Sequence, residues 1–165
     1  MSPMTSGSAK VTLPTDEQIL IEREFDAPKS LVYKAWTTPE LVKQWWHANR
    51  GEVTVAEIDV RVGGTWRYVS ITPDGFEVAF HGEYREIVPE ERIVSTEVYE
   101  GVPEEYANEG TLNTLTLTEK DGRTNLSVLV QAPNQTVRDA IIDSGMEAGM
   151  QDAMDLLEDV AQSLR

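Results

Sequence analysis

Apolar and polar residues alternate in seven stretches of the chain, and a period of two is typical of strands with one buried face. These stretches predict strands at residues 18–25, 53–62, 65–71, 77–88, 92–99, 111–119 and 124–131. The links between the later strands are short and contain the turn residues Gly63-Gly64, Pro73-Asp74-Gly75, Pro89-Glu90 and Lys120-Asp121-Gly122. Such links favour hairpins, so we expect one antiparallel sheet.

Two segments after the first strand have the apolar spacing of short helices. Each has a proline, Pro28 or Pro39, near its first helical position, and Thr38 is the expected N-cap of the second helix. The predicted apolar faces are Leu31, Val32, Ala35 and Trp36 in the first helix, and Leu41, Val42, Trp45 and Trp46 in the second. Because position i stacks on position i+4, both members of the Trp45-Trp46 pair widen one apolar stripe.

The C-terminal residues 136–164 keep a helical apolar spacing throughout and predict one long helix. Met146, Met150 and Met154 form a row on its apolar face. Gly145 and Gly149 fall inside this helix, where each glycine costs roughly 1 kcal/mol relative to alanine. We therefore expect another element to approach the helix closely at these glycines.

The composition bounds the class of protein. With 165 residues the chain has the size of one domain, and we expect a flexible tail at residues 1–16 and a single domain over residues 17–165. The formal net charge of −15 opposes binding to nucleic acid or to an anionic membrane surface. No apolar run has the length of a membrane span or resembles a secretory signal, so we expect a soluble, cytoplasmic protein.

Motifs for metal or nucleophilic chemistry are missing from the sequence. There is no cysteine, and His47 and His81 stand far apart and outside any ligand spacing. Phosphate-binding loops and the G-x-S-x-G elbow are also missing, so we expect no metal, no cofactor and no catalytic triad. We expect His81 to face away from the interior because it alternates with Phe80, which leaves His47 as the better placed of the two histidines.

The order of elements is one strand, two short helices, six strands and a long helix, which defines an α+β class. Four stretches carry a resemblance to a known family: "REFDAPKSLVYKAWTTPELVKQWW", "DVRVGGTWRY", "PDGFEVAFHGEYREIVPEERIVST" and "SGMEAGMQDAMDLL". They resemble the START-like (SRPBCC) superfamily, and within it the group named after the C-terminal domain of the activator of heat shock protein 90 ATPase. The resemblance runs from about Ile19 to Leu164. It implies the helix-grip, birch-pollen-allergen-like fold, a curved sheet of about seven strands around the long terminal helix.

The resemblance also implies a cavity between the sheet and the terminal helix. The candidate ligand-binding residues of this cavity are Trp45, Trp46, Trp66, Tyr68, Phe80, Tyr84, Met146, Met150 and Met154. The methionine row could equally well fill an ordinary core, as methionine at helical spacing usually does. Of Trp45 and Trp46 we expect one to lie in the core and one at the cavity, and the sequence leaves open which.

Three functions fit these residues. The leading hypothesis is a non-catalytic binding module for a small hydrophobic or amphipathic molecule. The second is a co-chaperone-like regulator of a heat shock protein 90 ATPase, with a chaperone partner and a role in the stress response, as the family name implies. The third is a cyclase- or hydratase-type enzyme, for which Glu97 is the one carboxylate we nominate, because it shares a strand face with Ile93 and Tyr99.

Three further features are less specific. We expect a structural ion pair among Asp59, Arg61 and Arg67. The alternative is a polar contact from this group to a ligand. The acidic segment 100–110 is either solvated or a lid over the cavity. A homodimer could form through an exposed strand or the short helices.

Overall fold

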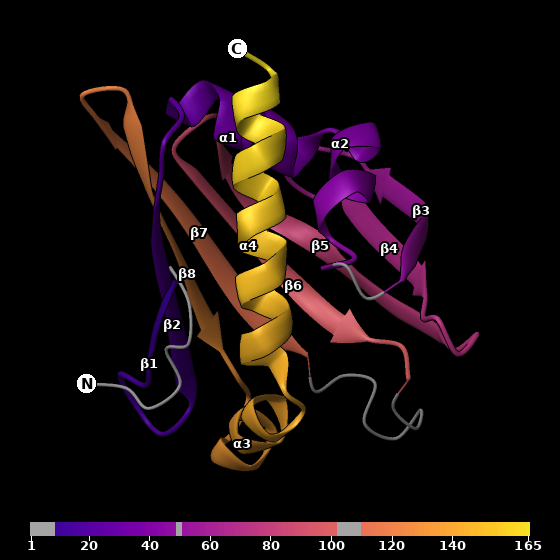
Figure 1. The fold of residues 1–165 in the computed structure, drawn as a ribbon. Coiled ribbons are helices and arrows are strands. Elements are labelled where there is room, and N and C mark those ends of the chain that lie inside the picture. The colour runs from indigo at the N-terminus through magenta and orange to yellow at the C-terminus, as the bar shows by residue number, and fades with distance from the viewer. Residues whose placement is uncertain (1–8, 49–50, 102–109) are drawn as a thin grey trace.

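The computed structural model describes residues 9–48, 51–101 and 110–165. These residues form an α+β fold in which one antiparallel sheet curves around a C-terminal helix (Figure 1). The strand order is β1-β2-β8-β7-β6-β5-β4-β3. The strands are β1 Lys10–Thr12, β2 Gln18–Phe25, β3 Glu52–Ile58, β4 Thr65–Ile71, β5 Glu77–Val88, β6 Arg92–Tyr99, β7 Thr111–Lys120 and β8 Arg123–Gln131.

Seven of these strands confirm the alternation in the sequence, and β1 is an addition to it. The segment predicted as a tail therefore contains a short strand, in which Val11 pairs with Ile21 of β2. Ala9, just before it, exchanges two backbone hydrogen bonds with the side-chain amide of Gln151, at 2.9 and 2.7 Å. A strand of three residues with one buried side chain is too short to show a period of two, so the pattern alone could not reveal β1. Residues 1–8 lie outside the described residues.

The helices are α1 Lys29–Thr37, α2 Pro39–Trp45, α3 Gln135–Asp143 and α4 Met146–Ser163. The two short helices pack against the C-terminal half of α4, whereas α3 lies at its other end (Figure 1). Thr38 is the N-cap residue of α2, but its side chain makes no capping hydrogen bond. Pro39 at the first helical position therefore does more than Thr38 to begin this helix.

The predicted long C-terminal helix is confirmed as α4, but it begins at Met146 and not at residue 136, because the chain breaks between α3 and α4. Gly145 adopts a left-handed backbone conformation with φ of 84°, which glycine reaches without steric cost. A Cβ atom at Gly145 would meet no atom within 4 Å, so no element approaches closely there, contrary to expectation. The apolar spacing continues across the break, so the sequence pattern does not reveal it. Asn134 begins α3 by accepting a hydrogen bond from the backbone N–H of Val137 at 2.9 Å.

The inner face of the sheet, which faces α4, has two parts of different character. We call the first part the aliphatic half; it comprises the inner faces of β2, β8 and the second part of β7. Its side chains are almost fully buried against one another and against α4, and they are Ile19, Ile21, Phe25, Leu115, Leu117, Leu126, Val128 and Val130. Leu157 and Ala161 of α4 are both 0 % exposed. This half forms the tight core of the protein.

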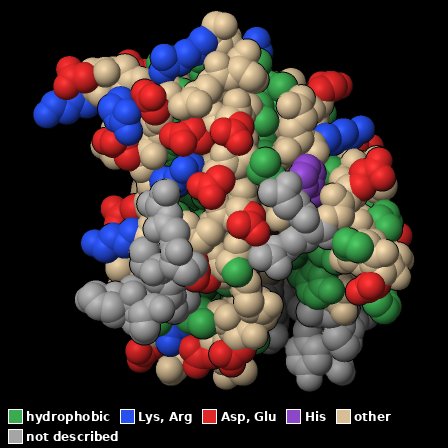
Figure 2. All heavy atoms as spheres, viewed as in Figure 1, with side chains coloured by type: hydrophobic (Ala, Val, Ile, Leu, Met, Phe, Trp, Pro, Cys, Tyr) green, Lys and Arg blue, Asp and Glu red, His purple; other side chains and the backbone are tan. Residues whose placement is uncertain are grey.

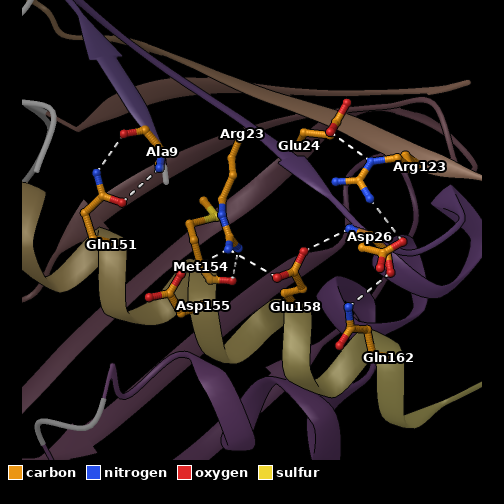
Figure 3. A network of polar contacts seen from close by, with 10 residues as sticks. All are labelled: Ala9, Arg23, Glu24, Asp26, Arg123, Gln151, Met154, Asp155, Glu158 and Gln162. Carbon is orange, nitrogen blue, oxygen red and sulfur yellow. Dashed lines mark hydrogen bonds and ion pairs between the residues drawn. The ribbon is translucent and has the colours of Figure 1, made fainter. Parts of the chain in front are cut away.

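Arg23 of β2 is buried in this half and holds α4 in place (Figure 3). Its guanidinium donates to the backbone carbonyl of Met154 at 2.6 Å, to Asp155 at 3.0 Å and to Glu158 at 3.4 Å. It also lies 4.6 Å from the centre of the Phe25 ring. The Nε atom makes no hydrogen bond within the described residues. The guanidinium thus binds a single turn of α4.

Further polar contacts extend this attachment along the helix (Figure 3). The backbone N–H of Asp26 donates to the second carboxylate oxygen of Glu158 at 2.8 Å. The backbone carbonyl of Asp26 accepts from Gln162 at 3.2 Å. Together with the Gln151 contacts to Ala9, these bonds join α4 to the β1–β2 edge over about three helical turns. We call this set, formed with Arg23, the edge clamp.

Replacing Arg23 tests the edge clamp. Arg23→Met keeps the aliphatic stem but leaves the carboxylate of Glu158 and the carbonyl of Met154 without their buried partner. Removing one partner of a buried polar network costs about 3 kcal/mol of unfolding free energy. The control is Arg123→Met, because Arg123 is 45 % exposed and pairs with the exposed carboxylates of Glu24 and Asp26, where each surface pair is worth about 1 kcal/mol or less. Urea unfolding of both variants measures this, and equal losses would contradict the clamp.

Gly82 of β5 is required by a close approach of two strands. The indole N–H of Trp66 on β4 passes over Gly82 and donates to the backbone carbonyl of Thr96 on β6 at 3.2 Å. A Cβ atom at Gly82 would lie 1.8 Å from that carbonyl oxygen and 2.6 Å from the indole nitrogen. A side chain of any size at this position would therefore displace Trp66.

Gly82→Ala is expected to lower the unfolding free energy by about 3 kcal/mol, because the added methyl group overpacks the sheet. Gly122→Ala is the control, because a Cβ atom at Gly122 would meet no atom within 4 Å. Its only cost is the strain of alanine at the positive φ of 77°, about 1 kcal/mol. Thermal unfolding with tryptophan fluorescence separates the two. A Gly82→Ala protein as stable as wild type would contradict the assigned contact.

Candidate ligand-binding site

The second part of the inner face, which we call the aromatic half, comprises the inner faces of β4, β5, β6 and the first part of β7. Cross-strand pairs place its residues side by side, with Tyr68 opposite Phe80, Phe80 opposite Tyr99, and Tyr84 opposite Ser95. The rings of Phe80 and Tyr99 lie 5.1 Å apart. The half thus presents a group of neighbouring aromatic rings on the inner face of the sheet.

Trp45 and Trp46 lie in different surroundings. Trp45 is 4 % exposed, packs 5.0 Å from Trp36 and donates its indole N–H to the carbonyl of Ala35 at 2.9 Å. Trp46 is half-buried and lies edge-on against Tyr68 and Phe80, with ring centres 5.4 and 5.6 Å away. Trp45 therefore fixes α2 to α1, and Trp46 belongs to the aromatic half.

The methionines of α4 differ in the same way. Met154 is 5 % exposed and belongs to the core, whereas Met146 and Met150 are only partly buried. Trp66, Tyr68 and Tyr84 are buried in the sheet. Of the nine predicted residues, the structure therefore gathers most around the aromatic half and places Trp45 and Met154 in the tightly packed core.

Polar groups lie among these aromatic side chains. Thr111 donates to the amide oxygen of Asn113 at 2.9 Å, and the amide nitrogen of Asn113 donates to Glu97 at 3.3 Å. The hydroxyl groups of Tyr68 and Tyr84, in residues that are only 7 % and 6 % exposed, make no hydrogen bond to any residue that the structure describes. Both hydroxyl oxygens keep some accessible surface, since Nε of Arg23 is the one fully buried side-chain polar atom without a partner among the described residues.

The electrostatics of this group follow from burial. Burial raises the pKa of Glu97, and the hydrogen bond from Asn113 opposes that rise. Burial also raises the pKa of Tyr68, and the charges of Tyr84 and Glu97 add to it. The pKa of Tyr84 is raised by burial, Tyr33 and Asp59.

Sequence reasoning named Glu97 but missed Asn113, Thr111 and Ser95. Each lies on the inner face, since Glu97 pairs with Thr111 and Ser95 pairs with Asn113. Asn113 interrupts a Thr- and Leu-rich strand at a position that the alternation assigns to the interior. An amide at an inward-facing position was the signal that could have revealed the polar group.

The outer surface holds the other candidate residues. Arg67 does not pair with Asp59; its Nε and Nη2 donate to the two carboxylate oxygens of Glu100, each at 2.9 Å. Nδ1 of His81 also contacts Glu100 at 2.9 Å. Asp59 pairs with Arg61 at 2.8 Å, as expected. Hydrogen bonds from Arg67 lower the pKa of Glu100 to about 2, with His81 assisting. His81 is exposed, as the alternation predicted.

A shallow hollow of about 190 Å³ lies over β2, β7 and β8, lined by Glu22, Thr116, Thr118, Asn125 and Ser127 on the outer face, with Arg23 and Leu126. No group of three metal-ligating side chains occurs within residues 9–48, 51–101 and 110–165. Among the described helices, none combines the length and apolar character of a membrane span. Residues 102–109 of the predicted lid lie outside the described residues.

A C-terminal helix gripped by a curved antiparallel sheet, with two short helices after strand β2, defines the helix-grip fold of START-like proteins. The family model described as Activator of Hsp90 ATPase homolog 1-like protein matches residues 26–162, and the chain belongs to this family. Among curated proteins, none matches the chain in sequence.

Solved structures of similar proteins agree with the fold. A protein from Rhodobacter sphaeroides is 25 % identical with a TM-score of 0.85, over 95 % of this chain and 99 % of that one. A protein from Chromobacterium violaceum is 27 % identical with a TM-score of 0.76, over 89 % and 98 %. The AHSA1-like protein from Aeromonas hydrophila, at 18 % identity and a TM-score of 0.66 over 89 % and 93 %, supports the fold alone.

The two perturbed carboxyl groups predict opposite dependences of stability on pH. Glu97 has a raised pKa in the folded protein, so its contribution is favourable below the ordinary value of 4.5 and is lost as pH rises through the folded pKa. Glu100 has a lowered pKa, so its contribution is present above 4.5 and is lost as pH falls toward 2.

The Glu97→Gln variant is therefore expected to have a higher unfolding free energy than wild type at pH 7. At pH 4 this difference should be smaller or absent. Glu100→Gln is expected to lose about 1 kcal/mol at pH 7, the upper range for an exposed pair, and progressively less toward pH 2. Urea unfolding across this range measures both. The assignment of Glu97 fails if Glu97→Gln is destabilised at pH 7 more than at pH 4.

Proposed function

We propose that this protein is a non-catalytic module that binds a small hydrophobic or amphipathic molecule between α4 and the aromatic half of the sheet. One observation carries the proposal. Inner-face residues of the aliphatic half are buried, whereas Phe80, Ser95, Glu97 and Asn113 keep partial exposure although they lie on the same face of the sheet. Partial exposure on this face therefore distinguishes the aromatic half from the aliphatic half among the described residues.

The side chains around this region suit an apolar ligand. Trp46, Phe80 and Tyr99 offer ring faces, and Tyr99 is 42 % exposed. Met146 and Met150 offer flexible, polarizable chains on the facing helix. Binding sites for small molecules are mostly apolar, with few polar groups that fix orientation, and Tyr68, Glu97 and Asn113 supply such groups.

The family description refers to activation of the Hsp90 ATPase. We do not carry that activity to this chain, because it rests on the family description and on no contact among the described residues. START-like domains include ligand-binding and regulatory modules, and the partly exposed aromatic half favours the first.

The test uses Nile red, an uncharged dye that fluoresces in apolar surroundings, and a pair of variants on β6. Ser95→Phe places a ring on the inner face beside Tyr84, whereas Val94→Phe places the same ring on the outer face. We expect wild type and Val94→Phe to bind the dye with similar affinity, and Ser95→Phe to bind at least tenfold more weakly.

Circular dichroism and thermal unfolding confirm that both variants fold. The proposal is wrong if wild type does not bind Nile red, or if folded Ser95→Phe binds it as wild type does. In the second case the dye occupies some other surface of the protein.

A further inference from the structure

We propose that the ligand of the aromatic half is an alkylammonium ion, whose charged end pairs with Glu97 of β6 while its apolar chain lies along the aromatic rings. The inference rests on the proposed binding function and specifies the charge of the ligand. It goes beyond that function, because the rings and methionines alone would accept apolar chains with many different head groups.

The first step is the position of Glu97 on the inner face of the sheet. The strand register places Glu97 opposite Thr111 of β7, and it places Phe80 opposite Tyr99. Tyr99 follows Glu97 by two positions, and side chains two positions apart on a strand share one face and lie about 7 Å apart. Glu97 is therefore a neighbour of the Tyr99 and Phe80 rings, whose centres lie 5.1 Å apart.

The second step is that Glu97 keeps an oxygen available to a ligand. The amide nitrogen of Asn113 donates to one carboxylate oxygen at 3.3 Å. No other hydrogen bond or ion pair joins Glu97 to a residue within the described part of the chain. The side chain is only partly buried, so a ligand that lies on the inner face can reach it.

The third step is the shortage of positive charge around Glu97. The one basic side chain on the described inner face is Arg23, and it is bound to Asp155 and Glu158 of α4. The arginines of β4, β5 and β6 pair with exposed or half-exposed carboxylates; they are Arg67, Arg85 and Arg92. Helix α4 has no basic residue, and Figure 2 shows acidic side chains along its exposed side. These surroundings attract a cation and repel an anion.

The fourth step is the gain from placing an ammonium ion at Glu97. Burial raises the pKa of Glu97, because an ionised carboxyl group that is partly desolvated and lacks a cation is costly. A positive charge beside the carboxyl group favours its ionised form, so binding itself supplies the missing partner. Pairing can therefore occur whether Glu97 is protonated or ionised in the free protein. Aromatic rings within about 6 Å of the ammonium ion add a cation–π attraction.

The test compares decylammonium, decanol and decanoate at pH 8 by displacement of Nile red. The three compounds have chains of similar length and differ in the charge of the head group. We expect wild type to bind decylammonium at least about fivefold more tightly than decanol, because the cation gains an ion pair and a contact with the rings. Decanoate is expected to bind most weakly of the three.

Two variants separate Glu97 from the overall negative charge of the protein. Glu97→Gln is expected to reduce the preference for decylammonium over decanol at least about threefold, because the ion pair is lost. Glu52→Gln is the matched control: it makes the same change of net charge at an exposed position on β3, and it should leave the preference unchanged. Circular dichroism confirms that both variants fold.

The outcomes separate this inference from the proposed function. A preference that Glu97→Gln and Glu52→Gln reduce equally, or that neither reduces, would overturn the assignment of Glu97 while the binding site itself stands. Wild-type protein that binds decanol as tightly as decylammonium would overturn it as well. If Nile red and all three compounds fail to bind, the proposed function is wrong, and this inference falls with it.

Discussion

The attachment of α4 to one edge of the sheet determines how the rest of the molecule is arranged. Arg23 satisfies the Met154 carbonyl and two acidic side chains of α4 from a buried position on β2, and Gln151 and Glu158 bind backbone groups of Ala9 and Asp26. A buried charge is costly unless it is paired and hydrogen-bonded, so the guanidinium permits few other positions of the helix. The edge clamp therefore fixes α4 over the aliphatic half.

The consequence for function appears on the opposite side of the helix. There α4 carries the partly buried Met146 and Met150, whose side chains lack the directional constraint of the edge clamp. The partly exposed Phe80, Glu97 and Asn113 lie on this side. A helix that is held firmly along one edge can leave room along the other without loss of the fold. Trp45 packs in the core between α1 and α2, while its neighbour Trp46 faces the aromatic half.

The sequence predicted the fold well and the site in part. The alternation of apolar and polar residues predicted β2, β4, β5 and β6 with the bounds observed, because each strand has one apolar face and ends at a turn residue. It failed at β1, which is too short to show a period, and at Gly145, where the helical period continues through a break in the helix. For the site, periodicity identified which rings share a face but not which are tightly packed. That difference depends on contacts between distant segments, such as the bond from Trp45 to Ala35 or from Arg23 to Met154.

The central claim is that a ligand enters between α4 and the aromatic half, and methyl resonances of methionine test it most directly. The chain has five methionines, of which Met146 and Met150 are partly buried on α4 and Met154 is core. In a protein labelled at the methionine methyl groups, titration with decanol should shift the signals of Met146 and Met150 at saturation, with a smaller change at Met154. Shifts confined to Met1 and Met4, or no shift at concentrations that displace Nile red, would contradict the account.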